Sequence, residues 1–289
     1  MNYLITLALL GAICACDDAR GPGSVELQTL RLGVLPDQAA EALVRQHTPL
    51  VEYLRTATLL DVELVLSDDY QKFLVDFDEG RLDLAWFGGL TFVQAEYRSD
   101  AVPLVTRDVD QDFRSCFLVS GSRPERLVAE FDGQRFTFGS RLSTSGHLMP
   151  RYFLEQDGRV PEVFFKSVQY SAGHDATAYL VRDGVVDLGV ANCFIFEQML
   201  EDGRLLSEQV RILGKTPPYH NYVWAVRRDL AREVESKILD AFLALDESIS
   251  EHAAILQAQD ARGYLPVSGE NFHELRQAAD SLGLLSDSS

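Results

Sequence analysis

The sequence predicts an α/β protein of two lobes that face each other across a ligand cleft. Strand-like and helix-like runs alternate almost throughout the chain, which is typical of a parallel sheet covered by helices. The runs fall into two groups, and beyond Asp229 the pattern is helical only. Because a closing helical segment must pack on an earlier sheet, we expect the chain to cross between the lobes more than once.

The 289 residues, 46% of them hydrophobic, are sufficient for one large domain or two medium ones. We expect residues 29–112 and 221–289 to form the first lobe, with residues 113–220 inserted as the second. Ligands of open α/β sheets bind at the carboxyl ends of strands, where the next helix begins. The loops of both lobes that have this position are therefore expected to line the cleft.

The first group alternates β-branched or aromatic runs with runs of helical periodicity. Thr91 is expected to cap the helix that follows the Gly88-Gly89 break. The predicted strands are 30–35, 62–66, 82–87 and 101–105, and the predicted helices are 39–57, 69–75 and 92–97.

The second group repeats this pattern, and helices alone follow it. The predicted strands are 115–119, 135–139, 164–170, 186–191, 210–213 and 222–226. The predicted helices are 145–156, 174–182, 194–200, 234–245, 251–258 and 272–284.

The amino terminus has the pattern of an export signal. Residues 4–13 form an apolar run that is too short for an ordinary membrane-spanning helix, and Ala15-Cys16 follows it. This ending resembles the site cleaved by lipoprotein signal peptidase, so we expect a signal peptide over residues 1–16, a lipid on Cys16 and a flexible tether over residues 17–28. The alternative is an apolar amino terminus or a mis-assigned start. The export signal predicts the periplasm, or the periplasmic face of the cytoplasmic membrane, as the location.

The formal net charge of −18 argues against nucleic acid and anionic membrane surfaces as partners, because such a field repels both. It also repels small anions, so any anion site must rely on buried, short-range donors. The expected contact with the membrane is the lipid anchor alone.

After signal removal and acylation, Cys116 and Cys193 remain. They could pair in an oxidising compartment, but two isolated cysteines favour buried free thiols. No CxxC or Cys/His cluster with zinc spacing occurs, so neither a metal nor a cofactor is expected.

Two segments combine a strand end, small hydroxylated residues and a helix start: residues 139–150 and 170–177. The first amides of a helix lack partners and carry partial positive charge, so two facing helix starts can hold an anion. Ser143, Thr144 and Ser145 add hydroxyl donors in the first segment, and His174 adds a ring N–H in the second. The alternative is a pair of ordinary N-caps.

A hydrolase would need Ser145, His174 and Asp175 to lie along one line. Adjacent residues diverge on a helix, and no G-x-S-x-G elbow, P-loop or dinucleotide fingerprint is present. The sequence therefore favours binding without catalysis.

Residues 84–89, 139–150 and 170–177 together resemble the periplasmic phosphate-, phosphite- and phosphonate-binding proteins of ABC importers. A branch associated with selenate transport is most similar in residues 86–95, 214–222 and 278–285. The resemblance implies a type II periplasmic-binding-protein fold: two α/β lobes joined by a hinge, with the ligand in the cleft between them.

Within this resemblance, Tyr70 reaches the oxyanion from the lobe opposite Ser143, Thr144, Ser145 and His174. Phe87 stands where family members often have Tyr, and Asn221 where amine-binding members have a carboxylate. Both departures favour a small bare oxyanion such as phosphite, phosphate, selenate or selenite. The full set of expected ligand-binding residues is Tyr70, Thr91, Ser143, Thr144, Ser145, Gly146, Tyr170, His174 and Asn221.

The resulting prediction is a monomeric, non-enzymatic lipoprotein that delivers an oxyanion to an ABC permease and its ATPase. Two alternatives remain: a periplasmic ligand sensor for a signalling partner, and a periplasmic serine hydrolase that uses Ser145.

Overall fold

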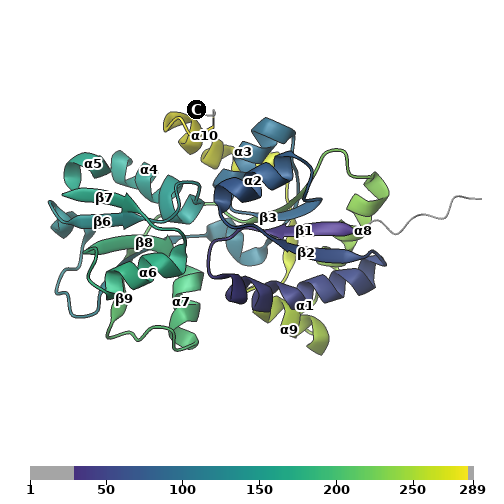
Figure 1. Cartoon of the computed structure of the whole chain (residues 1–289), viewed down its shortest axis with the longest axis horizontal. Coiled ribbons are helices and arrows are strands. Elements are labelled where there is room, and N and C mark those ends of the chain that lie inside the picture. Colours follow the sequence, from purple (N-terminus) through teal and green to yellow (C-terminus); the bar gives the residue numbers. More distant parts are fainter. Residues whose placement is uncertain (1–28, 286–289) are drawn as a thin grey trace, which may run out of the picture.

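The computed structural model describes residues 29–285, which form two lobes joined side by side (Figure 1). The predicted signal peptide, the lipidation site Cys16 and the predicted tether up to residue 28 lie outside the described residues. Across residues 29–285, no helix is both long and apolar enough to cross a membrane.

The first lobe is built on a six-stranded mixed sheet with the order β11-β4-β10-β3-β1-β2. β1 pairs in parallel with β2 and β3, whereas β10 runs antiparallel to both β3 and β4. Its strands are β1 (Leu30–Val34), β2 (Val62–Leu66), β3 (Leu84–Phe87), β4 (Val102–Arg107), β10 (Val223–Val226) and β11 (Tyr264–Pro266). The expectation of helices alone beyond Asp229 was wrong, because β11 adds an edge strand to β4.

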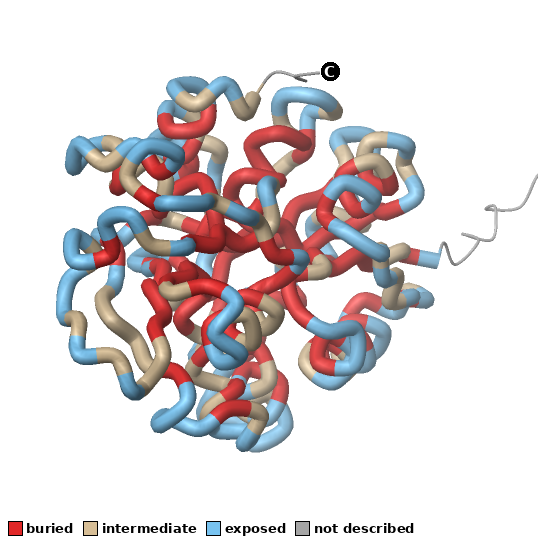
Figure 2. The backbone as a smooth tube through the Cα atoms, turned by 60° about the vertical axis from the view of Figure 1, so that its left-hand side comes forward, coloured by how far each residue is buried: buried red, intermediate tan, exposed pale blue. Residues whose placement is uncertain are grey.

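Helices cover both faces of this sheet, with α2 and α3 on one side and α1 and α9 on the other (Figure 1). The helices are α1 (Ala40–Thr58), α2 (Tyr70–Asp78), α3 (Gly89–Ser99), α8 (Arg232–Leu243), α9 (Ser250–Ala258) and α10 (His273–Ser281). Each turns an apolar stripe inward, and the buried residues run through the middle of the lobe (Figure 2).

The second lobe is built on a five-stranded mixed sheet with the order β7-β6-β8-β5-β9. Its strands are β5 (Ser115–Ser120), β6 (Arg135–Phe138), β7 (Ser167–Tyr170), β8 (Leu188–Asn192) and β9 (Val210–Lys215). Its helices are α4 (Met149–Gln156), α5 (Pro161–Phe164), α6 (His174–Arg182) and α7 (Cys193–Glu201). The strand expected over residues 164–170 is shorter, because Pro161 starts the one-turn helix α5.

Cys116 and Cys193 form a disulfide, so the preference for buried free thiols was wrong. β5 and β8 are antiparallel neighbours, and Cys116 lies opposite Ala191 in their register. The chain leaves β8 and begins α7 at Cys193, which brings the two Cα atoms to 5.1 Å from each other. This proximity depends on strand pairing between residues 77 positions apart.

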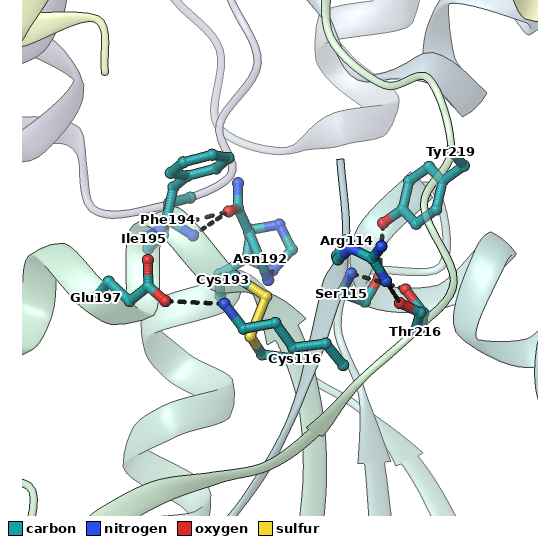
Figure 3. The surroundings of a disulfide bond; sticks show 12 residues. Arg114, Ser115, Cys116, Asn192, Cys193, Phe194, Ile195, Glu197, Thr216 and Tyr219 are labelled. Carbon is teal, nitrogen blue, oxygen red and sulfur yellow. Dashed lines mark hydrogen bonds and ion pairs between the residues drawn. A yellow bond between two sulfur atoms is a disulfide. The ribbon is translucent and has the colours of Figure 1, made fainter. Parts of the chain in front are cut away.

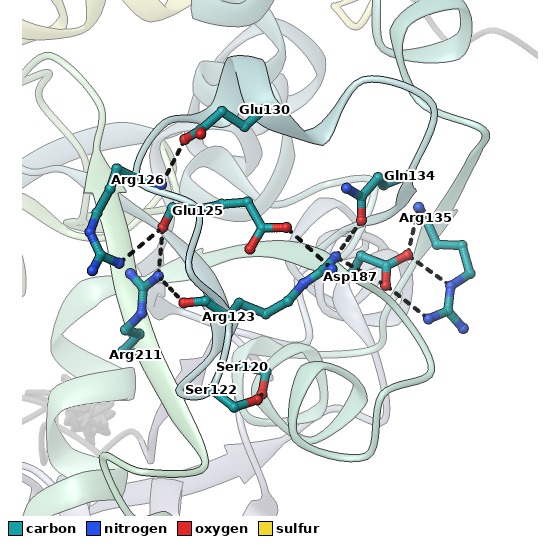
Figure 4. A network of polar contacts seen from close by, with 10 residues as sticks. All are labelled: Ser120, Ser122, Arg123, Glu125, Arg126, Glu130, Gln134, Arg135, Asp187 and Arg211. Atoms are coloured by element: carbon teal, nitrogen blue, oxygen red, sulfur yellow. Dashed lines mark hydrogen bonds and ion pairs between the residues drawn. The ribbon is translucent and has the colours of Figure 1, made fainter.

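A polar network fixes the loop between β5 and β6 (Figure 4). Arg211 donates to the main-chain oxygens of Arg123 and Glu125, and Arg123 and Arg135 both pair with Asp187. These contacts lie at the amino-terminal ends of β6 and β8. They therefore hold the sheet at the end opposite to the helix starts that the sequence singles out.

Two crossing segments connect the lobes, one from β4 to β5 and one from β9 to β10. Phe113 of the first and Tyr219 of the second exchange main-chain hydrogen bonds of 2.9 Å in both directions. The paired crossings, together with two mixed α/β sheets, give the two-lobe architecture that the sequence predicts.

Candidate functional site

The segment after β6 makes a tight turn and then a short π-helix over Thr144–Leu148. The Ser143 hydroxyl accepts the N–H of Gly146 at 2.9 Å, and Gly139 N–H donates to the Gly146 carbonyl at 2.7 Å. A Cβ on Gly146 would lie 2.9 Å from the Gly139 Cα, so this approach requires glycine. The predicted residue Gly146 therefore shapes the turn through its backbone.

This turn brings several hydrogen-bond donors close together. Ser143, Thr144 and Ser145 are all buried, with exposed fractions of 2%, 3% and 1%. The backbone N–H groups of Thr144 and Ser145 donate to no acceptor among the residues described, as expected for the first amides of a helical segment. Hydroxyls and free amides that converge at a helix start can bind several oxygens of one anion.

His174 begins α6 in the second segment and faces the first. The Asn192 N–H, at the end of β8, donates to His174 Nδ1 at 3.1 Å, so the neutral ring carries its hydrogen on Nε2. Nε2 lies 3.5 Å from Ser145 Oγ. Burial lowers the pKa of His174 to about 3, so the ring is a neutral donor at physiological pH.

Tyr70 reaches the same place from the first lobe. Asp69 caps α2 by accepting the Lys72 N–H at 2.8 Å, and this fixes Tyr70 as the first residue of the helix. Burial first, and the nearby Asp37 carboxylate second, raise the pKa of Tyr70 far above its usual value, while a contact with Ser143 opposes the shift. Tyr70 therefore keeps its hydrogen and meets Ser143 across the cleft.

The start of α3 is already occupied by protein groups. Gly89 N–H donates to Asn221 Oδ1 at 3.1 Å, and Leu90 N–H donates to the Thr144 hydroxyl at 2.8 Å. Gly88 is the N-cap, so the expectation of Thr91 as cap was wrong: Thr91 lies inside the first turn and donates its hydroxyl to the Gly88 carbonyl. The Nδ2 group of Asn221 is buried and donates no hydrogen bond to any described residue.

The structure does not bring Tyr170 to this group. Its hydroxyl accepts from Arg151 at 3.1 Å and lies 3.4 Å from His147 Nε2, both on the α4 side of the second lobe. Asp175 accepts the N–H of Ala39 and of Ala176. Because the Asn192 amide occupies His174 Nδ1, no carboxylate orients the ring as a hydrolase triad would require.

Sequence reasoning missed four residues that complete the site: Asp37, Asn192, Tyr219 and Tyr222. Asn192 adjoins the disulfide, and Tyr219 bonds Ser115 at 2.6 Å (Figure 3). Asp37 follows Pro36 directly after β1, at the strand end where ligands of such sheets bind. The same rule that selected the other loops could therefore have found it.

No lysine or arginine of residues 29–285 donates to Ser143, Thr144, Ser145 or His174. The buried Arg107 forms two hydrogen bonds with Asp110 and lies 5.3 Å from the Tyr222 ring. The cleft opens to solvent through a cavity of about 630 Å³ lined by Tyr70, Ser140 and Gly173, among others. The arrangement can hold a small tetrahedral oxyanion with neutral donors.

Comparisons with known proteins agree with this geometry. A family model described as the periplasmic substrate-binding protein of phosphonate ABC transporters matches residues 32–272. The probable phosphite-binding protein PhnD1 of Prochlorococcus marinus (strain MIT 9301) is 28% identical over 296 aligned positions that cover 97% of each chain. The phosphate-import protein PhnD of Mycolicibacterium smegmatis is 25% identical, over 96% of this chain and 94% of that protein.

Among solved structures, that of Prochlorococcus marinus PhnD1 in complex with methylphosphonate superposes with a TM-score of 0.83 at 28% identity. The match covers 89% of this chain and 98% of the other. The two chains therefore share the two-lobe fold over almost their whole length.

Proposed function

Because the chain belongs to the family of periplasmic substrate-binding proteins of phosphonate ABC transporters, we propose that it binds a small oxyanion of the phosphonate or phosphite type. It is the substrate-binding component of an ABC importer. The observation that carries the choice of ligand is the convergence of the Ser143–Ser145 turn and His174 on one buried place. Relatives that are named for phosphite, phosphate and methylphosphonate support this class.

We assign the phosphorus oxygens to the second lobe. The Ser143, Thr144 and Ser145 hydroxyls, the free amides of Thr144 and Ser145, and His174 Nε2–H supply donors from several directions. Neutral hydrogen bonds in a buried site are strengthened by the low local dielectric constant. Such a site needs no cation to hold an anion, which suits a chain whose long-range field is negative.

The first lobe closes over the ligand. Tyr70 adds a hydroxyl from α2, and the free Nδ2 of Asn221 adds a donor from the crossing before β10. Contacts already join the lobes on both sides of the site: Leu90 N–H to Thr144 and His174 N–H to the Asp37 carbonyl. We propose that residues 29–112 with 221–289, and residues 113–220, move as two bodies about the paired crossings.

We further propose that Cys16 carries a lipid, that the protein is a monomer and that its contact with the membrane is this anchor. The Cys116–Cys193 disulfide supports an oxidising compartment, in keeping with the periplasmic family. The loaded form would be read by the permease and ATPase complex of the importer.

Isothermal titration calorimetry on the mature chain from Asp17 onward, without lipid, tests the ligand class. Saturable binding is expected for phosphite or methylphosphonate. Phosphate, sulfate, selenate and selenite complete the panel. A clear preference for selenate would identify selenate as the ligand instead. Flat titrations with every member would overturn the proposal.

A pair of variants tests the place of binding. Ser145→Ala removes a buried hydroxyl that faces His174, and a loss of affinity of about 10- to 100-fold is expected. The matched control is Ser122→Ala on the loop of Figure 4, where the Ser122 hydroxyl is hydrogen-bonded only to the Ser120 hydroxyl among the described residues. This variant should bind as the unmodified protein does. Equal affinity for both variants would place the ligand elsewhere.

A further inference from the structure

A buried carboxylate lies beside the proposed anion site. Asp37 is 4% exposed and belongs to the loop between β1 and α1. Its neighbours include Tyr70 and His174, two of the residues assigned to the ligand. A carboxylate repels an anion, so its presence beside neutral donors requires a reason other than attraction.

Asp37 is held in place by a closed ring of hydrogen bonds that spans both lobes. Its main-chain oxygen accepts the His174 N–H at 2.9 Å, and Oδ2 accepts the Tyr222 hydroxyl at 2.7 Å. Asn192 completes the ring, because its Nδ2 donates to the Tyr222 hydroxyl at 3.0 Å and its N–H to His174 Nδ1 at 3.1 Å. The same residue that selects the tautomer of His174 therefore also orients the Asp37–Tyr222 pair.

The two lobes approach each other closely at Asp37, and one of its carboxylate oxygens has no side-chain donor. A Cβ on Gly173 would lie 2.9 Å from the Asp37 carbonyl oxygen, so the two lobes approach there as closely as glycine permits. Tyr222 is the one side chain within residues 29–285 that donates to the Asp37 carboxylate. Oδ1 receives no hydrogen bond from any side chain within residues 29–285.

The ionisable groups around Asp37 come from four directions. Tyr222 precedes β10, Tyr70 starts α2, Asp175 follows His174 on α6, and Arg107 ends β4. The positive charge of Arg107 is shared with Asp110, which forms both of its ion-pair hydrogen bonds. Burial raises the pKa of Asp37 to about 7, although the Tyr222 hydrogen bond and the Arg107 charge lower it.

We infer that the Asp37 carboxyl group and the bound oxyanion share a single proton, so that Asp37 makes ligand capture proton-coupled. The inference rests on the proposed function, since it concerns the same site. Two adjacent anionic oxygens in a buried site cannot both stay ionised, whereas one O–H···O⁻ hydrogen bond between them is short and strong. The proton can come with a monoanionic ligand or sit on Asp37 beforehand. No bond other than this hydrogen bond changes.

The pH dependence follows from counting protons. Near neutral pH, the ligand or Asp37 already carries the shared proton, and binding takes up none. Above about pH 8 both partners are ionised when free, so each binding event must take one proton from the buffer, and affinity falls about tenfold per pH unit. Other site residues do not titrate in this range, because the pKa of His174 lies far below it and that of Tyr70 far above it.

Calorimetry at pH 8.5, in two buffers of different ionisation enthalpy, measures the protons taken up. The unmodified protein titrated with methylphosphonate is expected to take up one proton for each ligand bound. Its dissociation constant should rise about tenfold from pH 8 to pH 9. Tight binding without proton uptake would overturn the inference and leave the proposed function intact, whereas absence of binding at any pH with every oxyanion of the panel would overturn the proposed function.

Asp37→Asn keeps the shape of the side chain and removes its titration. This variant should bind methylphosphonate with no proton uptake and with a flat affinity between pH 8 and pH 9. Asp175→Asn removes a neighbouring negative charge and should still take up one proton. Identical proton uptake in the Asp37→Asn variant would assign the shared proton to another group.

Tyr222→Phe provides a second readout if Asp37→Asn does not fold. It removes the hydrogen bond that lowers the pKa of Asp37, so the pH at which proton uptake begins should move upward. A purely structural role of Asp37 would leave that pH unchanged.

Discussion

The two lobes are stabilised in different ways and contribute different chemistry to the cleft. The first lobe holds most of one continuous apolar core, which extends to Leu148 and Met149 of the second lobe. The second lobe has two smaller clusters of its own, one on each face of its sheet, and a disulfide that ties β5 to α7. The second lobe supplies free hydroxyls, amides and a neutral imidazole. The first lobe supplies a helix start that is already occupied, a tyrosine and a buried carboxylate.

This difference indicates a division of labour. The lobe with the smaller cores carries the more exacting geometry, and the disulfide ends one residue from Asn192, which sets the tautomer of His174. A covalent link limits how far the β8 end and the β5 start can separate when the chain is unfolded. The first lobe can rely on its large core and contribute residues that select and enclose the ligand.

Breaking the disulfide should have the largest effect. The double variant Cys116→Ala/Cys193→Ala is expected to lose about 4 kcal/mol of unfolding free energy, because the bond closes a loop with a sequence separation of 77. Urea unfolding of the variant, and of the unmodified protein with and without a reductant, measures this. Equal midpoints for all three samples would show that the second lobe does not depend on the bond.

The corresponding test in the first lobe is the buried pair of Arg107 and Asp110. Asp110→Asn leaves the guanidinium buried without its anion and should cost about 3 kcal/mol. The matched control is Asp183→Asn, which removes an exposed pair with Arg182 and should change stability by less than about 1 kcal/mol. If both variants unfold at the same urea concentration, the buried pair is not what supports the first lobe.

A third comparison concerns the ligand donors of the two lobes. Ser143→Ala should weaken methylphosphonate binding by about 2 kcal/mol, because its hydroxyl also accepts the Gly146 N–H and the turn loses both contacts. Tyr70→Phe removes one donor from the first lobe and should cost about 1 kcal/mol. Calorimetry at pH 7 measures the loss of methylphosphonate affinity in both variants. A larger loss for Tyr70→Phe than for Ser143→Ala would reverse the proposed division of labour.

The smallest effect is expected on acidification. The pKa of His174 is lowered to about 3 by burial, so the unfolded chain binds a proton first and stability falls as pH decreases below 6.5. The loss for this ring should be about 1 kcal/mol or less at pH 6. Thermal unfolding between pH 7 and pH 6 measures it, and His174→Gln should show a shallower decline. An unchanged slope in that variant would assign acid sensitivity to the other buried histidines.

Several parts of the fold and site were accessible from the sequence. The alternating pattern predicted two α/β lobes, and the comparisons confirm the family and the fold. The Ser143–Ser145 turn and His174 were identifiable because small hydroxylated residues after a strand mark a helix start. Asp37 has the same position after a strand, but its contacts with Tyr222 and His174 join distant parts of the chain and have no local signal.

The sequence alone determined the local elements and the residue types available at each strand end, because periodicity, caps and turn residues act within a few positions. Only the tertiary structure decided which of these meet. Strand pairing joined Cys116 to Cys193, packing within the first lobe brought Asp37 to Tyr222, contact between the lobes brought Asp37 to His174, and packing turned the Tyr170 hydroxyl to Arg151. Each of these contacts joins residues distant along the chain, and no local pattern encodes which of them meet.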